Sequence, residues 1–254
     1  MSSAVAEAIV ISGEDGVRVS GLLQTPERAR ACYVLAHGAG AGMTHPFMAA
    51  IAAELALRGI ATLRYQFPYM EHGARRPDPP RLAHATVRAA VAVASRMLPS
   101  LPLIAGGKSF GGRMTSQAQA ASALPGVRAL AFLGFPLHPA GRPARDRAEH
   151  LFAVQVPLLF LQGTRDALAT LDQLEPVCAA LGARATLKLF ADADHSFHVP
   201  ASTGRKDSQV RGDVLDALAA WIDGVIAGSA PKQQPATGSK KPARAAPPSP
   251  SRLP

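Results

Sequence analysis

Continuous apolar runs alternate with segments of helical spacing along most of the chain, and this alternation constrains the fold more than any other feature. The apolar runs lie at residues 32–36, 60–65, 101–105, 129–133, 158–162 and 186–190. Helical spacing is found at residues 47–58, 82–97, 111–123, 171–181 and 207–226. Continuous apolar runs are typical of strands buried on both faces, and a helix between two such strands makes them parallel. The sequence therefore predicts an α/β fold with a mostly parallel sheet and helices on both faces.

Two shorter apolar runs precede this alternation, at residues 8–11 and 17–23. The residues between them, Glu14-Asp15-Gly16, form a turn signal that is typical of an antiparallel hairpin. With this N-terminal hairpin, we expect the sheet to have about seven to eight strands.

The end of the chain has a different composition. Residues 228–254 are rich in Pro, Ala, Lys and Ser and have almost no large apolar side chain. No acidic residue follows Asp223, whereas five basic residues do: Lys232, Lys240, Lys241, Arg244 and Arg252. The formal net charge of the whole chain is +9, so this segment carries more than half of the excess. Because it cannot bury enough apolar surface to offset the entropy cost of ordering, we expect a folded domain over residues 1–227 and a disordered basic tail over 228–254.

The tail's charge predicts weak attraction to anions at most, and no specific nucleic-acid partner. The two cysteines, Cys32 and Cys178, lie in apolar segments and are not part of any Cys/His cluster of metal-ligand spacing. We therefore expect two buried free thiols, no metal and no organic cofactor. The N-terminus lacks the apolar core of a signal peptide, and no apolar run reaches the length of a membrane span. These features predict a cytoplasmic protein.

A glycine-flanked serine motif, Gly107-Lys108-Ser109-Phe110-Gly111, lies between the predicted strand 101–105 and the predicted helix 111–123. The pattern G-x-S-x-G in this position is typical of a nucleophile elbow. The sharp turn lifts the serine hydroxyl clear of the sheet, and the glycines are required because a Cβ would collide with the neighbouring strand or helix. The helix N-terminus also places its dipole beneath a developing oxyanion. We therefore predict that Ser109 is a nucleophile.

Two nucleotide-binding motifs are excluded in the same part of the sequence. A phosphate-binding P-loop that ended at Lys108 would need glycine where Pro102 stands. A dinucleotide-binding G-x-G-x-x-G motif that began at Gly38 would need glycine where Met43 stands.

A serine nucleophile requires a base, and the base requires a carboxylate that orients it. In the order that the elbow predicts, the acid comes before the histidine. Asp166 and His195 directly follow the last two predicted strands and are the candidates. His198 is the alternative base, and Asp192 and Asp194 are the alternative acids, although both lie very close to His195 in sequence.

The oxyanion that forms on attack requires two backbone N–H donors. One is predicted at Phe110, directly after the nucleophile. The second is expected in the glycine-rich loop 37–42, where Ala39 is the first choice and Gly40 the next.

Substrate contacts are predicted from His37 and from the loop 66–80, which is rich in Pro and Arg. In that loop the candidates are Tyr69, His72 and Arg75. The composition of this loop is equally consistent with two roles, a wall of the site and a rigid connector.

Six segments in the same order resemble the α/β-hydrolase superfamily over residues 1–227. They are HGAG at 37–40, FPYM at 67–70, PDPP at 77–80, GGKSFGGRM at 106–114, GTRD at 163–166 and DHSF at 194–197. They are similar to the small esterases of the dienelactone-hydrolase-like group, and more closely to its testis-expressed-thirty-like branch of predicted hydrolases. The resemblance implies Ser109, Asp166 and His195 as a catalytic triad, and it implies no particular substrate. The segment 135–156 stands where larger hydrolases carry a lid domain and is too short for one, so we expect an open, shallow site.

The leading hypothesis is a serine hydrolase that cleaves an ester or related acyl bond of a small molecule. A second hypothesis is a non-catalytic interaction module or complex subunit, with the basic tail as a tether. A third retains the triad for acyl transfer or peroxide chemistry. The sequence carries no prediction of the oligomeric state.

Overall fold

One eight-stranded sheet organises the part of the chain that the computed structural model describes, residues 4–13 and 16–228. The strand order is β1-β2-β4-β3-β5-β6-β7-β8. The strands are β1 (Ala6–Ser12), β2 (Arg18–Gln24), β3 (Ala31–Ala36), β4 (Ile60–Tyr65), β5 (Leu103–Lys108), β6 (Val127–Leu133), β7 (Leu158–Gly163) and β8 (Ala185–Phe190). β1 pairs antiparallel with β2, and β2 pairs antiparallel with β4. All other neighbouring pairs are parallel, which confirms the predicted sheet and its antiparallel hairpin.

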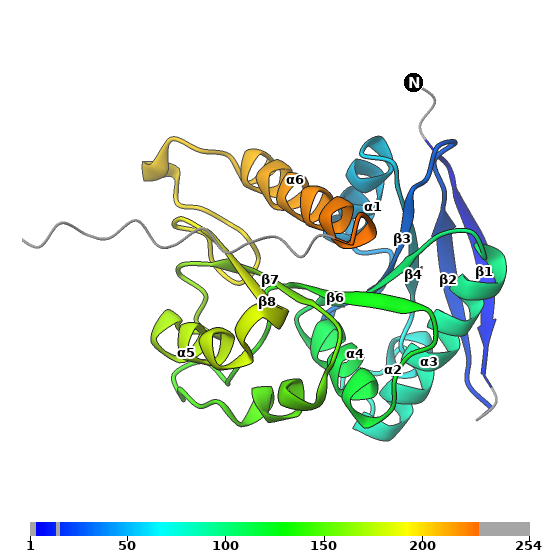
Figure 1. Cartoon of the computed structure of the whole chain (residues 1–254), viewed down its shortest axis with the longest axis horizontal. Coiled ribbons are helices and arrows are strands. Elements are labelled where there is room, and N and C mark those ends of the chain that lie inside the picture. The colour runs from blue at the N-terminus through cyan, green and yellow to red at the C-terminus, as the bar shows by residue number, and fades with distance from the viewer. Residues whose placement is uncertain (1–3, 14–15, 229–254) are drawn as a thin grey trace, which may run out of the picture.

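Helices cover both faces of this sheet (Figure 1). They are α1 (Pro46–Leu57), α2 (Pro68–Glu71), α3 (Pro80–Met97), α4 (Phe110–Ala121), α5 (Leu171–Leu181) and α6 (Asp207–Ile226), with short 3-10 helices η1 (Asp146–Ala153), η2 (Gly182–Arg184) and η3 (Ala201–Thr203). α1 and α6 share one hydrophobic core with one face of the sheet, whereas α3, α4 and α5 share the other core with the opposite face. Apart from Gly228, the predicted disordered tail lies outside the described residues.

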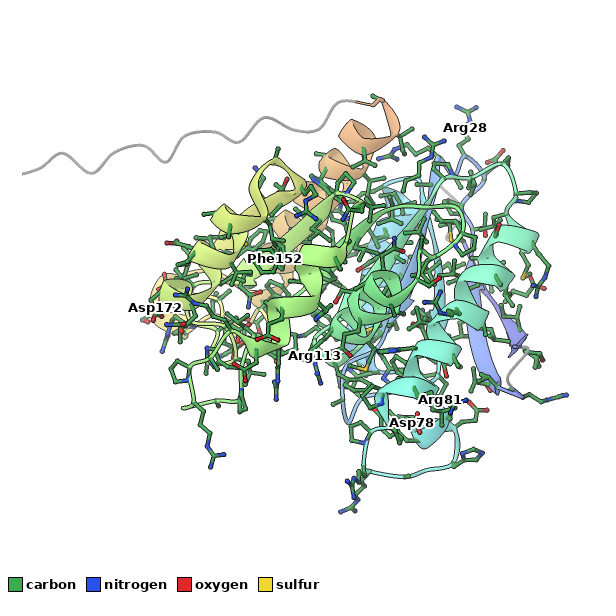
Figure 2. The ribbon with its side chains drawn as sticks, turned by 60° about the horizontal axis from the view of Figure 1, so that its bottom comes forward. Arg28, Asp78, Arg81, Arg113, Phe152 and Asp172 are labelled. Carbon is green, nitrogen blue, oxygen red and sulfur yellow. The ribbon has the colours of Figure 1, made fainter. Side chains whose placement is uncertain are left out.

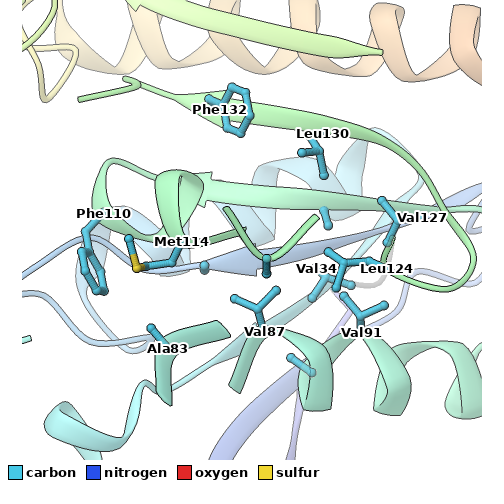
Figure 3. Packing of buried hydrophobic residues seen from close by; sticks show 14 of the residues in the cluster. Val34, Ala83, Val87, Val91, Phe110, Met114, Leu124, Val127, Leu130 and Phe132 are labelled. Atoms are coloured by element: carbon cyan, nitrogen blue, oxygen red, sulfur yellow. The ribbon is translucent and has the colours of Figure 1, made fainter. Parts of the chain in front are cut away.

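The core that α3, α4 and α5 share holds the N-terminal end of α4 in place. Val87 of α3 lies beside Met114 of α4, with Phe110 at the start of α4 and Val91 one turn further along α3 (Figure 3). All four side chains are buried. Burial of one such side chain stabilises the fold by ~1.5–3 kcal/mol, so the position of α4, and of the turn before it, is strongly held.

The main departure from the predicted elements is in β5. The sequence predicts a strand over 101–105, whereas β5 runs from Leu103 to Lys108. Gly106 and Gly107 have no side chain to signal burial, but both pair with β6 and both pair with β3. Hydrophobic patterning cannot detect a strand end that is made of glycine.

Two connections also contain structure that the sequence did not predict. α2 lies within the loop 66–80, and η1 lies within the segment 135–156. Cys32 and Cys178 are both buried and free, as expected.

Candidate active site

Ser109 lies in a strained turn between β5 and α4. Its backbone has φ 49° and ψ −115°, a conformation that non-glycine residues rarely adopt and that is often found at functional sites. A Cβ at Gly107 would lie 2.2 Å from the carbonyl oxygen of Ala36, and one at Gly111 would lie 2.4 Å from that of His37. The elbow therefore packs directly on β3 and the residue after it, as the glycine pattern predicts.

The structure brings Ser109, His195 and Asp166 into one hydrogen-bonded chain. The Nε2 atom of His195 is 2.8 Å from the Ser109 Oγ, and its Nδ1 atom is 2.7 Å from Asp166 Oδ2. The Asp166 side chain is fully buried, whereas 21% of the His195 side chain is exposed. The imidazole can therefore exchange a proton with the hydroxyl on one side while a desolvated carboxylate holds its other nitrogen.

The buried carboxylate of Asp166 accepts two further hydrogen bonds. The backbone N–H of Leu168 donates to Oδ1 at 2.8 Å, and the side-chain amide of Gln162 donates to Oδ2. The other end of the Gln162 amide accepts from the Phe135 N–H at 2.9 Å, so its orientation is set. Gln162 is a site residue that the sequence analysis missed. The available signal was a polar side chain at the end of the otherwise apolar strand β7.

The alternative base and acids lie elsewhere. The exposed His198 pairs with Asp207 at 2.8 Å, which raises the pKa of the histidine. Asp194 accepts from the backbone N–H groups of Ser196 and His198 and so shapes the loop that carries His195. Asp192 is exposed, and its backbone N–H donates to Thr164.

Two of the three predicted oxyanion donors are free to bind a ligand. Within residues 4–13 and 16–228, the N–H groups of Phe110 and Ala39 have no hydrogen-bond acceptor. Gly40 instead donates its N–H to the Tyr69 hydroxyl at 3.4 Å. Of the two candidates in the glycine-rich loop, Ala39 therefore fits the donor role better than Gly40.

The expectation that His37 contacts the substrate is wrong, because this side chain is fully buried. Its Nδ1 lies 2.8 Å from the Gly38 carbonyl oxygen, and its Nε2 accepts from the Phe67 N–H at 3.0 Å. Burial lowers the pKa of His37 to about 4, so the ring is neutral and can keep both bonds. His37 therefore joins the glycine-rich loop to the chain after β4.

The loop 66–80 also differs from the prediction. Tyr69 is buried, and its ring packs against those of His37 and Phe110 behind the elbow. His72 is exposed and lines a separate hollow beside residues 76–80. Arg75 is exposed and lines neither that hollow nor the cavity at Ser109. None of Tyr69, His72 and Arg75 lines the cavity at Ser109, so the structure gives no support to these three residues as substrate contacts.

A cavity of about 510 Å³ opens over Ser109 and His195. Phe47, Met48 and Leu168 give it apolar walls. Among the described residues that line it, Lys108 is the only lysine, arginine, aspartate or glutamate. The Lys108 ammonium donates to the backbone carbonyl of His195 at 2.6 Å. Burial lowers the pKa of Lys108 to about 8, although the carboxylates of Asp166 and Asp194 oppose this shift. Lys108 was predicted only as part of the serine motif, with no role of its own.

In the described ranges, no three His, Cys, Asp or Glu side chains gather closely enough to hold a metal ion. None of the helices in those ranges combines the length and the hydropathy needed to cross a bilayer.

Comparison with known proteins agrees with this geometry. Residues 29–223 match the family described as alpha/beta hydrolase domain. The fold is similar to dienelactone hydrolase from Anabaena variabilis, with 21% identity, a TM-score of 0.72 and coverage of 87% of this chain and 98% of that one. It is also similar to a serine hydrolase without a lid from Xanthomonas campestris, with 23% identity, a TM-score of 0.66 and coverage of 85% and 94%. An esterase domain from Rhodothermus marinus is 19% identical, with a TM-score of 0.65 and coverage of 86% and 98%.

These structural likenesses show the fold, and the family match covers most of the folded part of the sequence. The resemblance to dienelactone-hydrolase-like proteins is thereby confirmed, while the testis-expressed-thirty-like branch stays a prediction. The chain belongs to the alpha/beta hydrolase family.

Proposed function

We propose that this protein is a serine hydrolase of ester or related acyl bonds. The observation that carries the proposal is the hydrogen-bonded chain from Ser109 through His195 to Asp166, which begins at a strained elbow in an open cavity. Structural neighbours that are described as a dienelactone hydrolase and an esterase domain support the same class of reaction.

In the proposed mechanism, His195 removes the hydroxyl proton as the Ser109 Oγ bonds to the substrate carbonyl carbon. The N–H groups of Phe110 and Ala39 bind the resulting oxyanion, and Asp166 stabilises the imidazolium. His195 then gives its proton to the departing alcohol as the bond from carbon to the alcohol oxygen breaks. A water molecule, deprotonated by His195, attacks the acyl-enzyme, and the acid leaves as Ser109 regains its proton.

The shape of the cavity supports small or extended substrates. Its walls are apolar at Phe47, Met48 and Leu168, and the segment after β6 contains only the short helix η1 where a lid domain would stand. The lidless relative from Xanthomonas campestris has the same overall fold. We expect a reducing, cytoplasmic environment, in which the two buried thiols stay free.

Hydrolysis of p-nitrophenyl acetate by wild type, Ser109→Ala and Ser196→Ala tests the proposal. Ser196 lines the same cavity, so its variant is a matched control that also removes one hydroxyl. We expect kcat to fall by about 10⁴-fold or more in Ser109→Ala and to change little in Ser196→Ala. Equal background rates for wild type and Ser109→Ala would reject a hydrolase and favour the non-catalytic interaction module. Acyl transfer to a non-water acceptor would appear as a product other than the free acid.

A further inference from the structure

A second group of basic side chains lies outside the cavity at Ser109, where α3, α4 and η1 meet. This basic cluster consists of His84 on α3, Arg113 on α4, and Arg147 and His150 on η1. None of the four residues lines the cavity at Ser109. Figure 2 shows the face of the molecule that carries Arg113.

Hydrogen bonds hold the cluster to one face of α4. The hydroxyl of Ser116 lies 2.7 Å from the His150 Nε2 and donates to the backbone carbonyl of Arg113 at 2.9 Å. One turn after Arg113, the side-chain oxygen of Gln117 lies 3.2 Å from the His84 Nε2. Residues three and four apart on a helix share a face, so α4 brings both imidazoles to the side on which Arg113 lies.

The charges of the cluster act on one another and have the same sign. Burial is the main cause that lowers the pKa of His150, of His84 and of Arg113. The positive charge of Arg113 adds to this effect at both histidines, and that of Arg147 adds to it at Arg113. Burial, followed by the charges of Arg113 and His84, lowers the pKa of His150 to about 4. At neutral pH the imidazole of His150 is therefore uncharged, and the two guanidinium groups carry the positive charge of the cluster.

Neither guanidinium group is neutralised by the protein. In residues 4–13 and 16–228, Arg113 and Arg147 make no ion pair and no side-chain hydrogen bond, and the Nε of Arg113 is buried without a partner. A buried donor without an acceptor costs free energy. Arg113 also lies near the N-terminus of α4, where the helix dipole disfavours a cation.

The nearby carboxylates of η1 face another way. Side chains three residues apart are aligned along a 3-10 helix, so Asp146 and Glu149 share one face, and Arg147 and His150 share another. Asp146 and Glu149 line a separate hollow together with Pro176 of α5. The cluster is therefore a concentration of positive charge that its own element does not offset.

We propose that the basic cluster is a binding site for a phosphate group, either free or carried by a small phosphate ester. Two unpaired guanidinium groups match the charge of a phosphate dianion, and their planar N–H donors suit its oxygens. The Nε2 atoms of His84 and His150 are already bonded to Gln117 and Ser116, so each imidazole has only its Nδ1 atom left for a further hydrogen bond. The site is independent of the hydrolase proposal, because no residue of the triad takes part in it.

Calorimetric titration with inorganic phosphate, and in a second arm with phenyl phosphate, tests this site. Wild type, Arg113→Gln, Arg147→Gln and Arg128→Gln are compared. Arg128 is an exposed arginine near the amino end of β6, so its variant removes one positive charge at a distance from the cluster. We expect millimolar or tighter binding to wild type, and weakening by about tenfold or more in the two cluster variants but not in Arg128→Gln.

Tighter binding of phenyl phosphate than of inorganic phosphate would identify a phosphate ester as the ligand, whereas equal or weaker binding would identify the free ion. No heat of binding to wild type, or the same weakening in all three variants, would overturn the proposal. Ser109→Ala should bind phosphate as wild type does. A failed hydrolase assay would therefore reject only the proposed activity, and a failed phosphate titration would reject only the phosphate site.

The pKa of His150, measured by nuclear magnetic resonance, distinguishes a phosphate site from a cluster with only a structural role, because phosphate would not change it in the second case. A bound phosphate anion favours the imidazolium form, so phosphate should raise the pKa of His150 from about 4. In Arg113→Gln that pKa should already be higher without phosphate, and added phosphate should move it less. An unchanged His150 titration with saturating phosphate would contradict binding at this cluster.

Discussion

Asp166 has the most constrained side chain of the candidate active site. It is fully buried, and its oxygens accept from His195, from Gln162 and from the Leu168 N–H. A buried carboxylate is stable only when it is paired and hydrogen-bonded in this way. The sequence could place Asp166 after a strand, but it could not reveal the amide that supports it, because Gln162 fits the end of any buried strand.

Asp166→Asn tests the role of this carboxylate. The amide should hold the wrong tautomer of His195 and should stabilise no imidazolium, so we expect kcat to fall by about 10³–10⁴-fold with a smaller change in KM. Asp192→Asn, at the exposed alternative acid, is the control and should keep wild-type kinetics. A loss of kcat in the Asp192 variant but not in Asp166→Asn would show that the acid follows the other strand, β8.

Lys108 gives a prediction for the pH dependence of the reaction. Its charged form is present below its pKa of about 8 and is lost as the pH rises through that value. Because the ammonium holds the loop of His195 through its carbonyl oxygen, loss of the charge should weaken that hydrogen bond, and kcat/KM should decline above about pH 8. Lys108→Met should be slower and should lack this alkaline limb, whereas Lys108→Arg should retain activity to higher pH. The same limb in Lys108→Met would show that another group causes it.

At the scale of elements, β5 and α4 position the nucleophile. The strand-turn-helix order around Ser109 was predictable because the apolar run 101–105 and the helical spacing after Gly111 are both plain in the sequence. The last residues of β5 were not predictable, because glycines contribute no hydrophobic pattern and pair with β3 and β6 through the backbone alone. The inward turn of the loop 66–80 at Tyr69 was also not predictable, because it depends on packing against Phe110.

Gly111→Ala tests how closely α4 approaches β3. The added Cβ would meet the His37 carbonyl oxygen at 2.4 Å, so the helix must shift, and we expect a loss of ~1–3 kcal/mol in unfolding free energy together with reduced kcat. Gly212→Ala is the matched control in α6, where the added Cβ meets nothing within 4 Å. That variant should be stabilised by up to ~1 kcal/mol, because alanine favours a helix interior. Urea denaturation measures both, and equal stabilities of the two variants would contradict the close approach.

At the scale of the whole molecule, the parallel sheet and its two cores followed from the alternation of apolar runs and helical segments. The roles of individual polar residues within this fold could not be predicted from the sequence. His37 was expected to contact the substrate, yet it is buried and its ring packs against those of Phe67 and Tyr69. Distinguishing a buried histidine from a cavity histidine requires the tertiary contacts.

The burial of His37 predicts a pH dependence of global stability. Its pKa is lowered to about 4 in the folded protein, from an ordinary value of 6.5. The unfolded chain therefore binds more protons between these values, and the unfolding free energy should decrease as the pH falls from about 6.5 to 4. The contribution of this residue is on the order of 3 kcal/mol. Urea denaturation across this range should show a shallower decrease in His37→Asn, and an equal slope in both proteins would contradict the assignment.

The central claim is that Ser109 is a nucleophile activated by His195. Intact-protein mass spectrometry after incubation with a fluorophosphonate tests it most directly, because the serine oxygen must displace fluoride from phosphorus to leave an adduct. We expect one phosphonyl group on wild type, located at Ser109 by peptide mapping, and none on Ser109→Ala or on His195→Ala within the same time. No adduct on folded wild type, or an equal adduct on Ser109→Ala, would contradict it.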